Sequence, residues 1–240
     1  MKKEEKNIRL QVFLSHSGTC SRRCAGEWIK AGRCNVNGKK VLEPSYPINP
    51  GRDKVLLNGK KVALRGKTYI LLNKPPGVIT TRKDRFAGKT VLDILPERFR
   101  YLYPVGRLDK DTTGLLLLTN DGELTHRLTH PRFEVDKLYQ AVLDKPLKNS
   151  DLNRLEKGIL IDRMPTAPCK IRCRDNSTVE ITLHEGRKRQ IKRMFSVLGY
   201  KVVELRRLQE SHLTLGDLKP GQWRFLSQRE IEGLYRSVEL

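Results

Sequence analysis

Residues 106–122 read Gly-Arg-Leu-Asp-Lys-Asp-Thr-Thr-Gly-Leu-Leu-Leu-Leu-Thr-Asn-Asp-Gly, and this stretch decides the fold. Arg107 and Asp109 are two residues apart, so an extended backbone places both side chains on one face. The polar residues that follow, together with Gly114, indicate a bend. The apolar run 115–118 has the length of a strand that is buried on both faces, and Asp-Gly closes it with a turn. The stretch therefore predicts a polar bend next to a buried strand.

Asp109 would lie at the edge of that strand, where water is scarce. Burial raises the pKa of a carboxyl group, whereas a neighbouring cation such as Arg107 lowers it. An acid kept ionised in this way is either a nucleophile or base, or one half of a structural ion pair. Taken alone, Arg107 and Asp109 favour the structural ion pair.

The complete stretch resembles the signature of the pseudouridine synthases, in the branch that acts on single sites of ribosomal RNA. That signature is Gly-Arg-Leu-Asp-x-x-Thr-x-Gly-Leu-Leu-Leu-Leu-Thr-Asn-Asp-Gly, and the chain matches every fixed position. The resemblance implies that Asp109 is the catalytic aspartate. It also implies that Lys137-Leu-Tyr139 matches the Lys-x-Tyr motif of the family, in which the tyrosine stacks on the target base.

A third segment, residues 185–195, is similar to the family pattern Glu-Gly-Arg-x-x-Gln-Ile-(Arg or Lys)-Arg-Met. The resemblance implies that Lys192 forms an ion pair with Asp109, as a point charge where an arginine would offer a planar fork. The segment Leu-Asn-Lys-Pro-Pro-Gly at 72–77 also matches the branch, and residues 80–90 are expected to form an RNA-facing loop. The basic residues that we expect to contact substrate RNA in this part of the chain are Lys74, Arg107, Arg187, Arg189 and Arg193.

The composition independently indicates a polyanionic partner. The 240 residues carry a formal charge of +21, with an isoelectric point near 10.0. Such an excess of positive charge points to RNA or DNA. No apolar run reaches the length of a membrane span, and residues 1–7 lack the apolar core of a signal peptide. We therefore expect a cytoplasmic protein that binds a nucleic acid and no membrane. The family resemblance implies that this nucleic acid is ribosomal RNA, and we expect the protein to be a monomer.

The five cysteines do not predict a metal site. Cys20, Cys24 and Cys34 lie close together with His16, but their spacing differs from that of a zinc ribbon. An odd number of cysteines is typical of free thiols in a reducing compartment. The implied reaction breaks and reforms a bond between sugar and base without redox change, so we expect neither metal nor cofactor.

Residues 1–65 are predicted to form a small RNA-binding domain of two helices and a hairpin-built sheet. Ser21 is a plausible N-cap for the second helix, and the dipeptides Asn37-Gly38 and Asn58-Gly59 predict hairpin turns. This part holds fifteen Lys or Arg against five acids, a net charge of +10. Its sequence is similar to the alpha-L RNA-binding domain that a small-subunit ribosomal protein and tyrosyl-tRNA synthetases share. The expected RNA-binding residues are Arg9, Arg22, Arg23, Lys30 and Arg33.

Residues 66–240 are predicted to form a larger catalytic domain with a mixed β-sheet and flanking helices. Apolar residues alternate in the segment 179–183, which indicates a strand, and recur at helical spacing over 191–198. Ser227 and Glu230 form the pattern of a capping box before a last helix. Strands and helices do not alternate strictly, so the predicted class is α+β.

The expected activity is therefore isomerisation of one uridine to pseudouridine, with the base flipped out of its stack. The resemblance favours large-subunit over small-subunit ribosomal RNA, and leaves open whether Asp109 acts as a nucleophile or as a base. One alternative makes Asp109, Asp111 and Asp121 metal ligands for phosphoryl transfer. Another is a non-catalytic ribosome-assembly factor, although such a protein has no need of Asp109, Tyr139 and Lys192 together.

Overall fold

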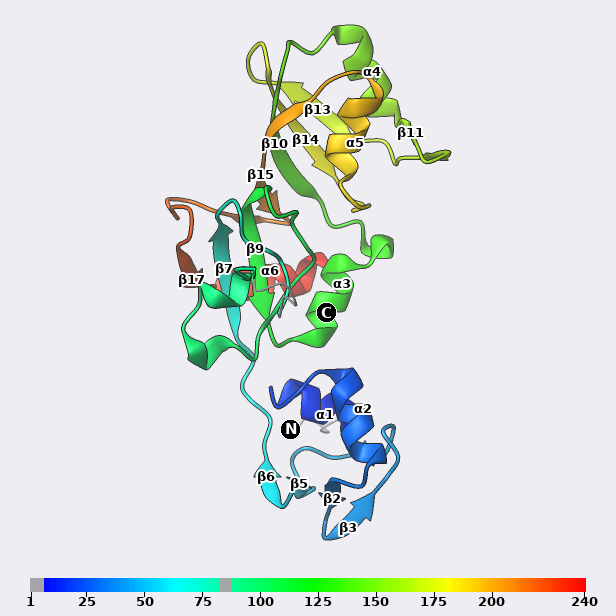
Figure 1. Cartoon of the computed structure of the whole chain (residues 1–240), viewed down its shortest axis with the longest axis vertical. Coiled ribbons are helices and arrows are strands. Elements are labelled where there is room, and N and C mark those ends of the chain that lie inside the picture. The colour runs from blue at the N-terminus through cyan, green and yellow to red at the C-terminus, as the bar shows by residue number, and fades with distance from the viewer. Residues whose placement is uncertain (1–6, 83–87) are drawn as a thin grey trace. The chain divides into compact units, whose positions relative to one another are not determined.

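The computed structural model describes residues 7–82 and 88–240, in which the chain forms two compact units, Met1–Thr68 and Tyr69–Leu240 (Figure 1). Residues 83–87, which belong to the predicted RNA-facing loop 80–90, lie outside the described residues. The polar ends of that loop are fixed, because Thr80 and Thr90 are both buried. Nothing in the described helices has the length and apolar character needed to cross a membrane.

The first unit contains two helices that pack against each other and, in its described residues, a four-stranded sheet of order β3-β2-β5-β6. Ser21 caps the second helix by accepting a hydrogen bond from the Cys24 amide at 3.2 Å, as predicted. Asn37 and Asn58 have φ values of 51° and 49°, which confirms both predicted hairpin turns. The elements are β1 (Ile8–Arg9), α1 (Leu10–His16), α2 (Arg22–Lys30), β2 (Cys34–Val36), β3 (Lys39–Val41), β4 (Pro47–Ile48), β5 (Val55–Leu57) and β6 (Lys60–Val62).

The second unit is built on a sheet whose described part has nine strands, in the order β13-β14-β10-β15-β9-β7-β17, with β16 beside β15 and β8 beside β9. β15 and β9 run parallel, whereas the other neighbours in this sheet are antiparallel. The mixed sheet confirms the predicted α+β class. Its strands are β7 (Tyr69–Lys74), β8 (Tyr103–Pro104), β9 (Thr113–Thr119), β10 (Lys137–Leu143), β13 (Lys170–Cys173), β14 (Thr178–Leu183), β15 (Val202–Glu210), β16 (Leu213–Thr214) and β17 (Trp223–Phe225).

The helices of this unit cover the sheet in two groups. Figure 1 shows α4 and α5 beside β10, β13 and β14, and α3 and α6 beside β7 and β9. The Ser227–Glu230 capping box at the start of α6 is present as predicted. The remaining elements are α3 (Gly122–Thr129), α4 (Asn149–Lys157), α5 (Gln190–Val197), α6 (Gln228–Ser237), the hairpin strands β11 (Leu160–Ile161) and β12 (Met164–Pro165), and the 3₁₀ helices η1 (Val91–Asp93), η2 (Glu97–Phe99) and η3 (Pro131–Phe133).

Strand β9 is buried on both faces, as the apolar run predicts. Leu115 and Leu117 belong to a core that includes residues of α3 and α6. Leu116 and Leu118 point the other way, into a core with residues of η1 and η2. Because period-two alternation sends these side chains to opposite faces, one strand connects two cores and holds the preceding loop rigidly.

Asp121, at the end of the signature, has a structural role. Its amide donates to the Thr119 hydroxyl at 3.0 Å, and its carboxylate caps α3 by accepting from the Leu124 amide at 3.2 Å. The same carboxylate accepts hydrogen bonds from the phenols of Tyr69 and Tyr235. The predicted turn is therefore the start of a helix, with its capping acid buried.

Candidate active site

Asp109 lies half-buried in the loop that joins β8 to β9. Its carbonyl accepts a hydrogen bond from the Thr112 amide at 3.1 Å, which closes a turn. The preceding residue, Leu108, is held by Thr80, whose hydroxyl donates to the Leu108 carbonyl at 2.8 Å. The backbone on both sides of Asp109 is therefore fixed, while its own side chain stays accessible.

Lys74 anchors this loop from the end of β7. Its side chain is 0 % exposed, and its ammonium donates to the carbonyls of Pro75, Lys110 and Thr112 at 3.2, 3.0 and 2.8 Å. A lysine ammonium has three donors, so all of them are used inside the protein. The prediction that Lys74 contacts RNA is wrong. Its strand is buried along its whole length, and the residue holds the Asp109 loop instead.

Burial lowers the pKa of Lys74 to about 8, although the charges of Asp111 and Asp109 act in the opposite direction. Removing an ammonium from water disfavours its charged form, and nearby carboxylates favour it. At neutral pH the residue remains charged, and Asp109 lies within reach of this buried cation.

Gly114 lets β15 approach the start of β9. The two strands run parallel, with Arg207 opposite Gly114. A Cβ atom at position 114 would lie 2.2 Å from the Arg207 carbonyl oxygen, and the φ of Gly114 is +102°. Glycine is therefore required at this position of the signature by close contact and by backbone conformation.

Tyr139, on β10, is near enough to Asp109 for the charge of that acid to act on the pKa of its phenol. The phenol is half-buried and packs against two of the hydrophobic cores. Burial raises its pKa, Arg207 opposes this change, and the charges of Glu210 and Asp109 add to it. Two of the predicted catalytic residues, Asp109 in its loop and Tyr139 on β10, thus interact electrostatically although they are distant in sequence.

A β-bulge in β15 decides which residues face Tyr139. Register with β10 pairs Tyr139 with Arg207 and Leu138 with Gln209, so that Leu208 is the extra residue. Beyond the bulge, Lys137 lies opposite Glu210. A bulge shifts the alternation of faces by one residue, so Arg207 and Glu210 share the face of Lys137 and Tyr139.

Arg207 and Glu210 form a buried ion pair in the second unit. Their side chains are 2 % and 1 % exposed, and Arg207 Nη2 lies 3.2 Å from Glu210 Oε2. Arg207 Nε also donates to the Leu115 carbonyl at 2.7 Å. Burial acts to lower the pKa of Arg207, but Glu210 and the Tyr139 phenol outweigh it and the net direction is upward.

The sequence analysis did not identify this pair. Leu205 and Arg207 alternate on the buried face of β15, and that spacing is the signal that could have identified the arginine. Glu210 has no such signal, because the bulge at Leu208 interrupts the alternation.

Lys192, on α5, hydrogen-bonds to Asp111. The ion pair that the resemblance implied, between Lys192 and Asp109, is absent from the described residues, and the expectation is corrected accordingly. Asp111 is two residues further along the same loop and more exposed than Asp109. Its carboxylate therefore accepts the hydrogen bond from the Lys192 ammonium. The pKa of Asp111 is lowered mainly by its hydrogen bond from Lys192, with a contribution from the charge of Arg189.

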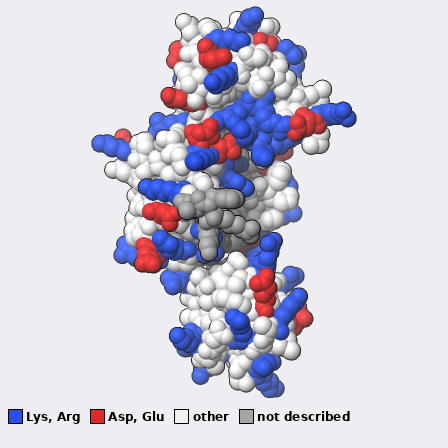
Figure 2. Space-filling model, in the orientation of Figure 1, with Lys and Arg blue, Asp and Glu red and all other residues white. Residues whose placement is uncertain are grey.

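Two other basic residues near α5 hold the β11–β12 hairpin. Arg187 donates to the carbonyls of Met164 and Pro165, and Arg193 pairs with Asp162 in the hairpin turn. Arg107 and Arg189 are exposed. Figure 2 shows Lys and Arg side chains gathered over the region of α5 in the same orientation as Figure 1.

In the first unit, the five predicted RNA-binding residues are all exposed. Arg22, Arg23 and Lys30 lie on α2, Arg9 precedes α1 and Arg33 follows α2. They are therefore available to phosphate, which a protein cation must reach through solvent.

The phosphoryl-transfer alternative needs three carboxylates that converge on one point. Asp111 is bound by Lys192, and the Asp121 carboxylate is buried against two phenols at the start of α3. Within residues 7–82 and 88–240, no three acids, histidines or cysteines are arranged to hold a metal ion. The three acids thus have separate roles.

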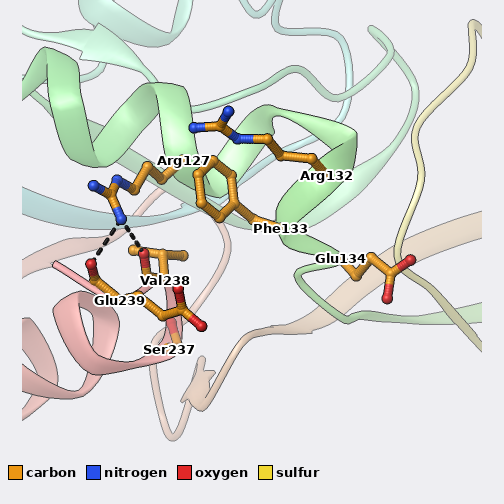
Figure 3. Close-up of a pocket in the computed structure, with 7 residues that line it drawn as sticks. All are labelled: Arg127, Arg132, Phe133, Glu134, Ser237, Val238 and Glu239. Carbon is orange, nitrogen blue, oxygen red and sulfur yellow. Dashed lines mark hydrogen bonds between the residues drawn. The ribbon is translucent and has the colours of Figure 1, made fainter.

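A pocket of about 450 Å³ lies elsewhere in the second unit, between α3, η3 and the end of α6. Figure 3 shows Phe133 between Arg127 and Arg132. Arg127 donates to the carbonyls of Val238 and Glu239 at 2.8 and 2.7 Å, which ties the end of α6 to α3. The residues that line this pocket include none of the predicted site residues.

Comparison with known proteins agrees with this fold. The family model for RNA pseudouridylate synthase matches residues 68–197, and the model for the S4 domain matches residues 8–54. A solved structure described as a pseudouridylate synthase superposes with a TM-score of 0.71 at 34% sequence identity, covering 95% of this chain and 99% of that one.

Two curated relatives match almost the whole chain. The ribosomal large subunit pseudouridine synthase B of Bacillus subtilis (strain 168) is 41% identical over 232 residues, covering 94% of this chain and 95% of the relative. An uncharacterized RNA pseudouridine synthase of Aquifex aeolicus (strain VF5) is 40% identical over 238 residues, covering 97% and 96%. The chain belongs to the RNA pseudouridine synthase family, and it is an isomerase with an N-terminal S4 domain.

Proposed function

We propose that this enzyme isomerises a single uridine of large-subunit ribosomal RNA, with Asp109 as the reacting carboxylate. The observation that carries the proposal is the fixed loop around Asp109, which Lys74 and Thr80 hold from two sides. The large-subunit target rests on the name of the Bacillus subtilis relative, which matches 94% of this chain.

Asp109 and Tyr139 have different roles in the proposed reaction. Asp109 either attacks the nucleotide or removes a proton from the ribose, in both cases as the ionised acid. Lys74 holds the backbone of the Asp109 loop through the carbonyls of Lys110 and Thr112. Tyr139 offers an aromatic face to the flipped base, whose extraction from its stack costs about a few kcal/mol.

Binding energy for the flip comes from phosphate contacts at a distance from the reacting atoms. The exposed cations of the S4 domain and those near α5 can supply such contacts, because each neutralised phosphate releases counterions. An enzyme whose formal charge is +21 can make enough phosphate contacts to offset the free-energy cost of base flipping.

The test is pseudouridine formation in unmodified ribosomal RNA from a strain that lacks the enzyme. We expect the wild-type protein to modify one position of large-subunit RNA without added metal or nucleotide, in the presence of a chelator. Asp109→Asn should abolish product while retaining RNA binding, and the matched variant Asp217→Asn, at an exposed acid, should behave as wild type.

The outcomes separate the parts of the proposal. Modification of small-subunit RNA alone would contradict the target. Full activity of Asp109→Asn, or strict dependence on an added metal, would contradict the mechanism. RNA binding without turnover by the wild-type protein would favour a ribosome-assembly role.

A further inference from the structure

The bulge in β15 creates two opposed pairs of polar residues inside the catalytic unit. Arg207 lies opposite Tyr139, and Glu210 lies opposite Lys137. Arg207 and Glu210 are both buried. Directly opposed residues on neighbouring strands are in contact range, so these four side chains form one cluster.

Arg207 connects the two strands on which the predicted catalytic residues depend. Its Nε donates to the carbonyl of Leu115 in β9, the strand that leads out of the Asp109 loop. A hydrogen bond also links its guanidinium to the phenol of Tyr139 on β10. A guanidinium only donates, so the phenol oxygen accepts this bond and its own hydrogen points elsewhere.

Stability alone does not account for the Arg207–Glu210 pair. Buried ion pairs lose most of their attraction to desolvation, and well-packed apolar replacements are often neutral or stabilising. Here Arg207 Nη2 and both carboxylate oxygens of Glu210 lack a hydrogen-bond partner of good geometry within the described part of the chain. Buried polar atoms without hydrogen-bond partners lower the free energy of unfolding, so the pair is a poor way to stabilise the fold.

We propose that Arg207, held by Glu210, is a positioning residue that fixes the hydroxyl of Tyr139 relative to the Asp109 loop. The inference rests on the proposed isomerase function. Arg207 touches neither the reacting carboxylate nor the base, and it acts through the phenol oxygen and the Leu115 carbonyl.

A double-mutant cycle between Arg207→Lys and Tyr139→Phe tests the connection. Lysine keeps the charge but loses the fork that reaches two acceptors at once, and phenylalanine removes only the phenol oxygen. We expect Arg207→Lys to lower kcat by about 10- to 100-fold with little change in KM, and to have a much smaller effect when Tyr139 is already phenylalanine. An equal loss of kcat in both backgrounds would overturn the inference.

A second variant separates positioning from folding. Replacing the pair by apolar residues, Arg207→Met with Glu210→Leu, should leave the melting temperature unchanged or raised, while kcat falls as in Arg207→Lys. A fall in melting temperature with full kcat in the surviving folded protein would mean a structural role and would overturn the inference. Failure of the wild-type enzyme to form pseudouridine would instead overturn the proposed function, and the inference with it.

Discussion

In the S4 domain Arg22, Arg23 and Lys30 extend from α2 into solvent, whereas in the catalytic unit Lys74 and Arg207 are buried. The same residue types serve different purposes in the two units. An exposed cation is free to meet phosphate, and its contribution depends on salt. A buried cation must satisfy its donors internally, and it therefore positions the atoms to which it donates.

This difference shows why net charge alone does not identify RNA contacts. The formal charge of +21 counts Lys74 and Arg207 with the rest. Only their hydrogen bonds to the carbonyls of Lys110, Thr112 and Leu115 show that they hold the backbone around the candidate active site. The predictions below test this division of roles.

The largest effect is expected from Lys74→Met. Methionine fills similar space but removes the ammonium that bonds the carbonyls of Pro75, Lys110 and Thr112. The Lys110 carbonyl keeps a second donor, the Gly77 amide, but the Asp109 loop loses its main anchor. We expect kcat to fall by about 100-fold or more, because small displacements of catalytic groups are costly. Affinity for RNA should change little, as measured by filter binding. Weakened RNA binding with a normal kcat would instead mean that Lys74 contacts RNA.

Alkaline pH should inactivate the enzyme through the same residue. The pKa of Lys74 is lowered to about 8, so the group is protonated below that pH and neutral above it. A neutral amine has two donors for three carbonyls. We expect kcat to fall by about tenfold per pH unit above pH 8, since one proton is lost. Burial raises the pKa values of Tyr69 and Tyr139, so these phenols stay protonated in that range.

Unfolding does not explain this loss of activity. Between pH 8 and the usual lysine pKa of 10.5, the unfolded chain binds more protons at Lys74 than the folded one, so this group makes the free energy of unfolding rise with pH. Thermal unfolding at pH 8 and 9 is the control. A kcat that stays constant to pH 9 would contradict the role of the ammonium.

A smaller effect is expected from Arg22→Ala combined with Arg23→Ala on the exposed start of α2. Loss of two phosphate contacts should raise KM by about tenfold and reduce the slope of log affinity against log salt by about 2, with kcat unchanged. The matched control is Lys60→Ala with Lys61→Ala on β6, which removes the same charge from another part of the same unit. Equal effects from both pairs would indicate a diffuse field, without an RNA-binding face on α2.

Much of the fold follows from local sequence. The run 115–118 predicts a doubly buried strand, and Ser21 and Ser227 mark helix starts, because capping and alternation depend on neighbouring residues. Asn37 and Asn58 predict their hairpins for the same reason.

The parts of the site that depend on long-range contacts could not be predicted in this way. Lys74 meets carbonyls that are 36 and 38 residues away, and its sequence neighbours do not show this. Lys192 hydrogen-bonds to Asp111 and not to Asp109, because the path of the loop brings Asp111 to α5. Glu210 faces Arg207 only because a bulge resets the alternation of β15.

The smallest effect is expected at Arg193, which tests the boundary between the two kinds of cation. Its guanidinium pairs with Asp162, and their side chains are 34% and 72% exposed. Such a pair contributes about 0.5 kcal/mol, so Arg193→Ala and Asp162→Asn should lower the free energy of unfolding by similar amounts, because asparagine keeps the left-handed backbone at a φ of 52°. If Arg193 serves only the hairpin, the salt dependence of RNA binding stays unchanged in both variants. A slope reduced in Arg193→Ala alone would place this residue with the exposed cations of α2, since only that variant removes a positive charge.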